Sequence, residues 1–202
     1  LGTQKLIQFA FRSYVGGLSA LGISTIRWVG AERLRRPGIL IVANHPTLID
    51  APVIMARVPQ IDCVVQDAHF DNPFLGILAR GAGYIPNRGG HQVIQSCVER
   101  LTRGRSLLIF PEGTRSPVNG LGPFLRGAAR IALESKCDPV PVTITCRPPA
   151  LFKERRWWQV PDHGFTLTLC VGEPFSVTDI VGEQTSRARA ARQLTAAMRE
   201  HF

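Results

Sequence analysis

Short apolar runs that alternate with helical patterns constrain the fold of this chain more than any other feature. Runs typical of buried strands occupy residues 38–43, 61–66, 106–110, 139–145 and 165–171. Helical patterns occupy residues 51–57, 73–81, 91–103, 124–135 and 186–202. This alternation predicts an α/β fold with a mainly parallel or mixed sheet flanked by helices. Ligands of such sheets bind beyond the carboxyl ends of the strands.

The polar run NHPTLID at residues 44–50 follows the first of these strands. His45 can accept a proton near neutral pH, and Asp50 can fix the imidazole tautomer and stabilise the imidazolium that forms. A structural interpretation is equally open, because Thr47 and Asp50 have the spacing of a capping box at the start of a helix. The run by itself therefore indicates either a general base or a helix cap.

A second polar turn follows the strand at 106–110 in the same way. Pro111 ends this strand, and the sequence continues with EGTR at 112–115. These four residue types offer a carboxylate, a permissive backbone, a hydroxyl and a guanidinium within one turn. That composition suits holding a polyhydroxylated or anionic molecule. A solvated surface turn is the structural alternative.

Over most of residues 38–146 the chain resembles the glycerolipid acyltransferases typified by 1-acyl-glycerol-3-phosphate acyltransferase. NHPTLID matches the family pattern NHxxxxD through Asn44, His45 and Asp50. The other matching blocks are NPFLGILARGAGYIPNR at 72–88, FPEGTRS at 110–116 with FLRGAARIAL at 124–133, and VPVTI at 140–144. Four blocks in the right order are far more specific than any one of them.

The resemblance implies transfer of a fatty acyl group to a hydroxyl of a lysophospholipid-like acceptor. The donor would be a thioester on acyl carrier protein or coenzyme A, with no further cofactor and no metal. His45 would be the general base and Asp50 its orienting partner. Residues expected to contact substrate are Asn44, Arg88, Glu112, Gly113, Thr114 and Arg115. The acceptor hydroxyl would attack the thioester directly, because no serine or cysteine lies in a recognisable nucleophile elbow.

The second block departs from the family pattern. Arg88 lies one residue closer to Pro86 than in the usual spacing, and Gln66 and Ala68 align where many members carry Lys and Glu. These changes remove charge near the expected acceptor site. We therefore expect lysophosphatidic acid to be a poor acceptor, or to share the site with a less charged lipid alcohol. A non-catalytic lipid-binding protein and a thioester hydrolase remain alternatives.

Composition narrows the choice of partners. The chain has 202 residues and a net charge of +9, without linkers or repeats, which suits one domain with a basic surface. Such a surface could meet anionic lipid headgroups or an acidic acyl carrier protein. A nucleic-acid partner is not expected, because no recognised binding motif accompanies the charge. Five scattered cysteines without a CxxC pair argue against disulfides and zinc, and favour a cytosol-facing location.

Residues 1–30 form an apolar, helix-prone segment ahead of a single acyltransferase domain at 31–202. The uncharged run between Arg12 and Arg27 is too short to span a bilayer, which takes about 20 apolar residues. The segment could instead lie in the membrane interface or pack on the domain as a helix or hairpin. Trp157 and Trp158, beside two arginines, suggest a second interfacial anchor. A peripheral or monotopic protein at the cytoplasmic face of a membrane is therefore expected.

Overall fold

The computed structural model describes residues 2–71, 75–153, 161–182 and 186–202. The strands are β1 (Ser24–Val29), β2 (Leu40–Ala43), β3 (Ile61–Gln66), β4 (Ile85–Asn87), β5 (Ser106–Ile109), β6 (Pro139–Arg147) and β7 (Phe165–Val171). The longer helices are α1 (Gly2–Ala20), α2 (Asp50–Arg57), α4 (Leu75–Ala82), α5 (Gly90–Thr102), α6 (Gly127–Ser135) and α8 (Arg187–Glu200). Shorter ones are the 3₁₀ turn η1 (Ala31–Arg35), α3 (Ala68–Asp71) and α7 (Val177–Val181).

The strands form one mixed sheet in the order β1-β7-β6-β2-β5-β3-β4. All neighbouring pairs are parallel except β6 with β7, which are antiparallel. The predicted α/β class with a mainly parallel or mixed sheet is therefore confirmed. β2 lies in the middle of the sheet, between β6 and β5, so the turn after it is flanked by strands on both sides.

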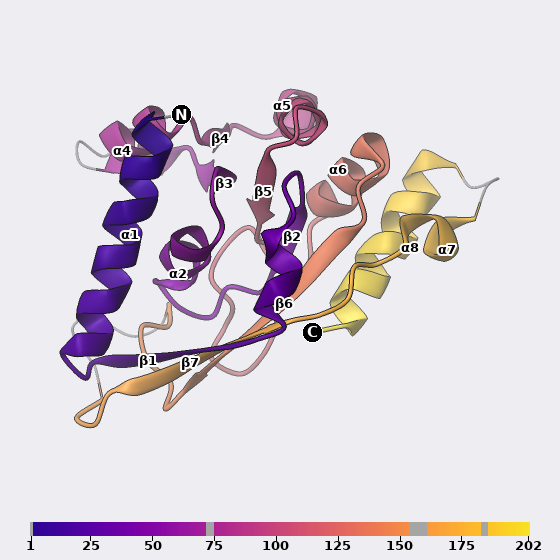
Figure 1. Cartoon of the computed structure of the whole chain (residues 1–202). Coiled ribbons are helices and arrows are strands. Elements are labelled where there is room, and N and C mark those ends of the chain that lie inside the picture. Colours follow the sequence, from indigo (N-terminus) through magenta and orange to yellow (C-terminus); the bar gives the residue numbers. More distant parts are fainter. Residues whose placement is uncertain (1, 72–74, 154–160, 183–185) are drawn as a thin grey trace.

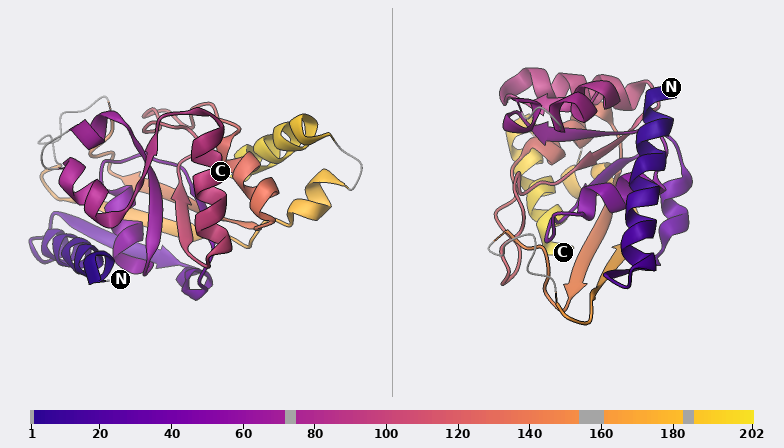
Figure 2. Two further views of the ribbon diagram at one scale, coloured as in Figure 1. Left: turned by 90° about the horizontal axis from the view of Figure 1, so that it is seen from above. Right: turned by 90° about the vertical axis from the view of Figure 1, so that its left-hand side faces the viewer.

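Alternation of side chains along β2 divides the core into two layers. Ile41 and Ala43 face the layer that contains α2, whereas Leu40 and Val42 face the layer that contains α5, α6 and α8. All four side chains are fully buried, as expected for a central parallel strand that is covered on both faces. Figures 1 and 2 show the two helical layers on opposite sides of the sheet, with α1 beside α2.

The N-terminal segment differs from its interpretation as a purely helical segment. Residues 2–20 are helical, but residues 24–29 form β1, which extends the sheet by pairing parallel with β7. Ile26 and Trp28 pack against the core, whereas the alternate residues Thr25, Arg27 and Val29 are exposed. β4 is the other strand that the sequence interpretation missed, and it is only three residues long. Trp157 and Trp158 lie outside the described residues.

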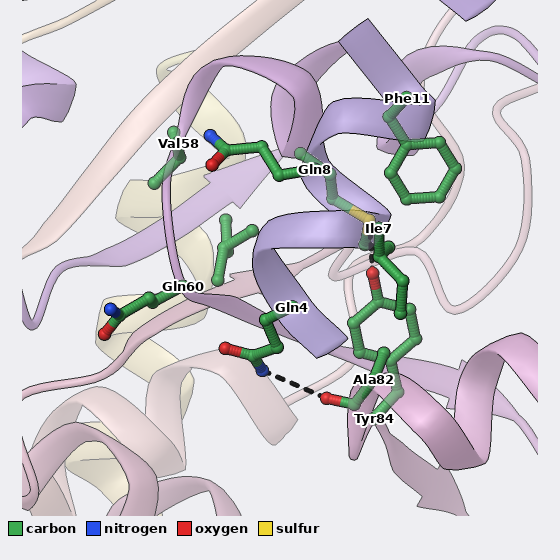
Figure 3. Close-up of a pocket in the computed structure, with 10 residues that line it drawn as sticks. Gln4, Ile7, Gln8, Phe11, Val58, Gln60, Ala82 and Tyr84 are labelled. Carbon is green, nitrogen blue, oxygen red and sulfur yellow. Dashed lines mark hydrogen bonds between the residues drawn. The ribbon is translucent and has the colours of Figure 1, made fainter. Parts of the chain in front are cut away.

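Helix α1 packs on the domain through one half-buried stripe. Gln4, at one end of this stripe, donates a hydrogen bond to the backbone carbonyl of Ala82 at 3.0 Å (Figure 3). Nearby, the hydroxyl of Tyr84 donates to the sulfur of Met55 at 3.1 Å. The opposite face of α1 leaves Leu6 and Phe9 about two-thirds exposed. In the described part of the chain, no helix is both long and apolar enough to cross a bilayer.

A buried carboxylate ties α1, β3 and β5 together at the amino ends of the central strands. Asp62 is fully buried and receives two hydrogen bonds from Arg105, at 2.5 and 2.6 Å. Arg100 donates to the same carboxylate at 3.3 Å, and Gln4 donates to it at 3.1 Å. A fully buried carboxylate is stable only with such partners.

We expect Asp62→Asn to lower the free energy of unfolding by about 2–4 kcal/mol, measured by urea denaturation. Breaking a buried ion pair typically costs about 3–5 kcal/mol, and the partial exposure of both arginines reduces that cost. The matched control is Asp67→Asn, because Asp67 pairs with Arg88 at an exposed site. That control should change stability by less than about 1 kcal/mol. Equal losses in the two variants would contradict a structural role for Asp62.

Candidate active site

The site is built on the turn that follows β2. Because β2 is a central strand, its carboxyl end places His45 between β6, which continues to Arg147, and the end of β5. The following turn leads directly into α2, which begins at Asp50. The turn after β5 contacts His45, as described below.

His45 and Asp50 form a hydrogen-bonded pair. The Nδ1 atom of His45 lies 2.9 Å from Oδ2 of Asp50. The aspartate side chain is fully buried, and the histidine side chain is 20% exposed. Because the carboxylate is an acceptor, the pairing places the ring proton on Nδ1 and leaves Nε2 with its lone pair. Among the described residues, no side chain or backbone group hydrogen-bonds to Nε2. The arrangement can therefore accept a proton from an incoming hydroxyl.

Asp50 serves the turn and the histidine at the same time. The backbone N–H of Thr47 donates to Oδ2 at 2.7 Å, and the Thr47 hydroxyl donates to Oδ1 at 2.5 Å. Burial raises the pKa of Asp50, whereas the hydrogen bonds from His45 and Thr47 act in the opposite direction. The capping interpretation holds in part, because the carboxylate reaches back to Thr47 although the helix cap itself is Ile49. Both interpretations of NHPTLID thus use the same carboxylate.

Phe110 fixes the plane of the histidine ring. The two rings are stacked, with centroids 4.0 Å apart and planes inclined by 17°. Phe110 immediately follows β5, so the strand that neighbours β2 provides this contact. Sequence reasoning missed this role, although the aromatic residue stands inside the FPEGTRS block.

The turn after β5 also holds the backbone of His45. The His45 N–H donates to Oε1 of Glu112 at 3.2 Å and to the Ser116 hydroxyl oxygen at 3.1 Å. In return, the Ser116 N–H donates to the His45 carbonyl at 2.7 Å, and its hydroxyl donates to Glu112 at 2.5 Å. Ser116 is buried and was not among the expected site residues. Its position in the network identifies it as a positioning residue.

Glu112 has a different environment from the one expected of an acceptor-binding carboxylate. It is only 6% exposed, and its second oxygen accepts the backbone N–H of Gly122 at 2.7 Å. Both oxygens are therefore engaged inside the protein. The physical reason for the difference is that a buried carboxylate needs hydrogen-bond donors, and the surrounding turn supplies them. This geometry supports a positioning role rather than the expected contact with the acceptor.

Asn44 likewise turns inward. Its side-chain amide donates to the carbonyl of Ile144 at 2.9 Å, and its side-chain oxygen accepts the Ile144 N–H at 2.6 Å. Asn44 thereby extends the pairing between β2 and β6 by one residue through its side chain. The expected substrate contact of this side chain has no support in the geometry.

The remaining expected residues lie in or beyond the EGTR turn. Gly113 has a backbone φ of 67°, which a side chain would strain, and its carbonyl accepts a hydrogen bond from Gln66 at 2.9 Å. Thr114 is exposed and accepts a hydrogen bond from Lys153 at 3.3 Å. Arg115 donates to the carbonyl of Leu151 at 3.1 Å. These contacts place two cationic side chains beside the turn.

Arg88 lies apart from the histidine. It follows β4, the edge strand, which is separated from β2 by β3 and β5. Three strand spacings correspond to about 14 Å. The guanidinium is 72% exposed and pairs with Asp67 at 3.0 Å. Arg88 therefore follows a strand that lies three places away from the one that carries His45.

Comparisons with known proteins find similarity to acyltransferases. Residues 25–145 match the family model described as Acyltransferase. Over 108 residues the chain is 30% identical to a chloroplastic 1-acyl-sn-glycerol-3-phosphate acyltransferase of Brassica napus, an alignment that covers 51% of this chain and 31% of that protein. Over 123 residues it is 36% identical to the lyso-ornithine lipid O-acyltransferase of Pseudomonas aeruginosa, covering 59% and 47%. The matched regions are thus about a third and about half of these relatives' lengths.

A solved structure shares the fold. The crystal structure of the 1-acyl-sn-glycerophosphate acyltransferase PlsC from Thermotoga maritima superposes with a TM-score of 0.73 at 22% sequence identity. The match covers 98% of this chain and 80% of that one. The sheet and its flanking helices are therefore an acyltransferase-like architecture over nearly the whole chain.

We expect Asn44→Ala to lower the free energy of unfolding by about 2–4 kcal/mol in urea denaturation. The substitution leaves the N–H and the carbonyl of Ile144 buried without partners, and each such group costs about 1–3 kcal/mol. Asn119→Ala is the control, because Asn119 is exposed and its loss should matter by less than about 0.5 kcal/mol. An Asn44→Ala protein as stable as the control would show that the two hydrogen bonds between Asn44 and Ile144 do not stabilise the fold.

Proposed function

Because the chain belongs to the acyltransferase family, we propose that it moves a fatty acyl group from a thioester to a hydroxyl of a lysophospholipid-like acceptor. The thioester would be carried on acyl carrier protein or coenzyme A. The observation that carries this proposal is the pairing of His45 with the buried Asp50, which leaves Nε2 free. A neutral hydroxyl is too weak a nucleophile to attack a thioester unless a base removes its proton. The His45–Asp50 pair has the geometry of such a base.

The reaction proceeds by direct attack. Nε2 of His45 takes the proton of the acceptor hydroxyl as the oxygen bonds to the thioester carbonyl carbon. The tetrahedral intermediate then collapses, the carbon–sulfur bond breaks, and the departing thiolate receives the proton from the imidazolium. Asp50 stabilises the imidazolium throughout. Ser116 does not serve as a nucleophile, because its hydroxyl is buried and donates to Glu112.

Cationic groups beside the turn suit an anionic part of either substrate. Arg115 and Lys153 come from different segments and both lie at the EGTR turn. Guanidinium and ammonium groups bind phosphate and carboxylate oxygens through charge-assisted hydrogen bonds. We assign the acceptor headgroup to Arg115 and Lys153, with Arg88 outside the immediate site.

The acceptor need not be a phospholipid. The Pseudomonas relative is named for an ornithine lipid, so acceptors outside the glycerophospholipids occur among the relatives of this chain. The pairing of Arg88 with Asp67 favours the same possibility, since this arginine is already matched by a carboxylate. A lyso-ornithine lipid is therefore a second candidate acceptor beside lysophosphatidic acid.

The acceptor would be reached at a membrane surface. The exposed Leu6 and Phe9 of α1 can enter the interface, while the net charge of +9 favours anionic headgroups. We propose peripheral attachment at the cytoplasmic face.

We expect His45→Ala to lower kcat/KM for acyl transfer by about 10²–10⁴-fold with the fold retained, since general bases contribute about this much. Release of free thiol from the thioester, with and without a lipid alcohol, is the assay. His91→Ala is the control, because His91 is exposed at the start of α5. Asp50→Asn should lose activity and also stability, because Thr47 loses its ionised partner. Near-full activity of folded His45→Ala would refute the mechanism, and thiol release that needs no alcohol would indicate a hydrolase.

We expect lysophosphatidic acid to be no better an acceptor than a lyso-ornithine lipid in side-by-side assays. Arg88→Ala should leave the use of both acceptors unchanged, because Arg88 follows the edge strand β4, about three strand spacings from β2. Arg103→Ala is the matched control, since both arginines are 72% exposed and ion-paired. A strong preference for lysophosphatidic acid that is lost only in Arg88→Ala would show that Arg88 binds the phosphate.

A further inference from the structure

A groove separate from the His45 site opens between α1, β1, η1 and α2. It has a volume of about 520 Å³, which lies within the range of about 300–1,000 Å³ found for small-molecule sites. The later residues of α2, Val53, Ala56 and Arg57, line it, whereas Asp50 at the first residue of the same helix belongs to the site. Figure 1 shows α1 beside α2, with β1 continuing from the end of α1. One short helix therefore connects the groove with the histidine pair.

The floor of the groove is apolar. Its larger apolar side chains are Val15, Ile26, Trp28, Leu34 and Val53. Leu34 and Val53 are buried, and the other three are half-buried. A floor of this kind favours a hydrocarbon chain over water.

Three arginines from three different elements line the same groove. Arg12 comes from α1, Arg35 from η1 and Arg57 from α2, and no carboxylate is among the lining residues. Within the described ranges, none of the three forms an ion pair with Asp or Glu. Arg33, by contrast, is held by Glu32 and Glu173 close by. The groove thus gathers positive charge that the protein itself does not neutralise.

Arg57 is held in place by the floor. Its guanidinium carbon lies 5.7 Å from the centre of the Trp28 ring, within the range of a cation–π contact. Among the described residues no group accepts a hydrogen bond from this guanidinium, so its N–H groups are available to a ligand. Guanidinium forks match the oxygens of a phosphate, so the chemistry of the groove fits a phosphate joined to hydrocarbon.

We propose that this groove binds the headgroup of an anionic phospholipid of the bilayer surface. The arginines contact the phosphate, and the floor covers the first part of the acyl chains. This rests on the proposed function only in that the protein works at a membrane. Phe9 precedes Arg12 by about one helical turn, so the exposed apolar residues of α1 enter the interface beside the groove. An acidic protein would pair with the arginines but would leave the apolar floor uncovered.

Binding there would set the distance of the site from the membrane. α2 has eight residues, which corresponds to about 12 Å of helix between the groove and Asp50. A lipid held at Arg57 fixes that end of α2 at the headgroup level. The histidine pair then lies within about 12 Å of that level.

The first test removes charge from the groove. Arg35→Gln/Arg57→Gln should lose at least about tenfold of its binding to phosphatidylglycerol-containing vesicles in sedimentation assays, with binding to pure phosphatidylcholine unchanged. Arg189→Gln/Arg192→Gln on α8 removes the same charge from another exposed surface and should lose much less. Equal losses of vesicle binding in the two double variants would show that binding depends on net charge alone, which would overturn the proposal. So would full vesicle binding by the groove variant, or loss of acyl carrier protein binding in its place.

The second test fills the groove without changing charge. A Cβ added at Gly16 or at Gly17 meets no atom within 4 Å, but only Gly16 lines the groove. Gly16→Phe should reduce binding to phosphatidylglycerol vesicles about tenfold, and Gly17→Phe should not. Equal binding by the two variants would overturn the proposal. All variants should transfer acyl groups to detergent-dispersed acceptor as the wild type does, so failure of the groove and failure of the proposed reaction remain distinguishable.

Discussion

The burial of the Asp50 carboxylate is the constraint on which the site depends. A carboxylate without contact with water must be supplied with donors, and here they come from Thr47 and His45. The bonds from Thr47 to Asp50 shape the turn between β2 and α2, and the bond from His45 to the same carboxylate orients the imidazole. The orientation of the base is thus a consequence of how the turn satisfies its own buried charge.

The turn after β5 supports the backbone and the ring of His45. Glu112 and Ser116 accept hydrogen bonds from the backbone N–H of His45, and Phe110 stacks on its ring. Because β2 and β5 pair in parallel, both turns emerge at the same edge of the sheet. Adjacent parallel strands therefore bring together two polar turns that are far apart in the sequence.

The sequence predicts the parts of the fold that are continuous and periodic. The central strands and the longer helices have apolar runs of the right length, and the histidine and aspartate are close enough along the chain to be linked by one turn. β1 and β4 were missed for a different reason. They are edge strands, one adjoining an apolar helix and the other only three residues long, so neither has a pattern of its own.

The direction in which a polar side chain points is what the sequence could not supply. Glu112 and Asn44 have residue types suited to binding a substrate, but burial turns both toward backbone groups. Two basic residues are also engaged inside the protein. Arg100 and Arg105 serve a buried carboxylate, so part of the net charge is structural and only the remainder is offered to partners.

The carbonyl of Leu151 has a consequence for which parts of the site can move. It accepts two hydrogen bonds, from the backbone N–H of Leu48 in the histidine turn and from the guanidinium of Arg115, each at 3.1 Å. An anion that attracts Arg115 removes only the second of these bonds, and the first still holds the turn. Binding and release of an anion at Arg115 therefore require only a rotation of the Arg115 side chain. The backbone of the turn that carries His45 keeps its conformation.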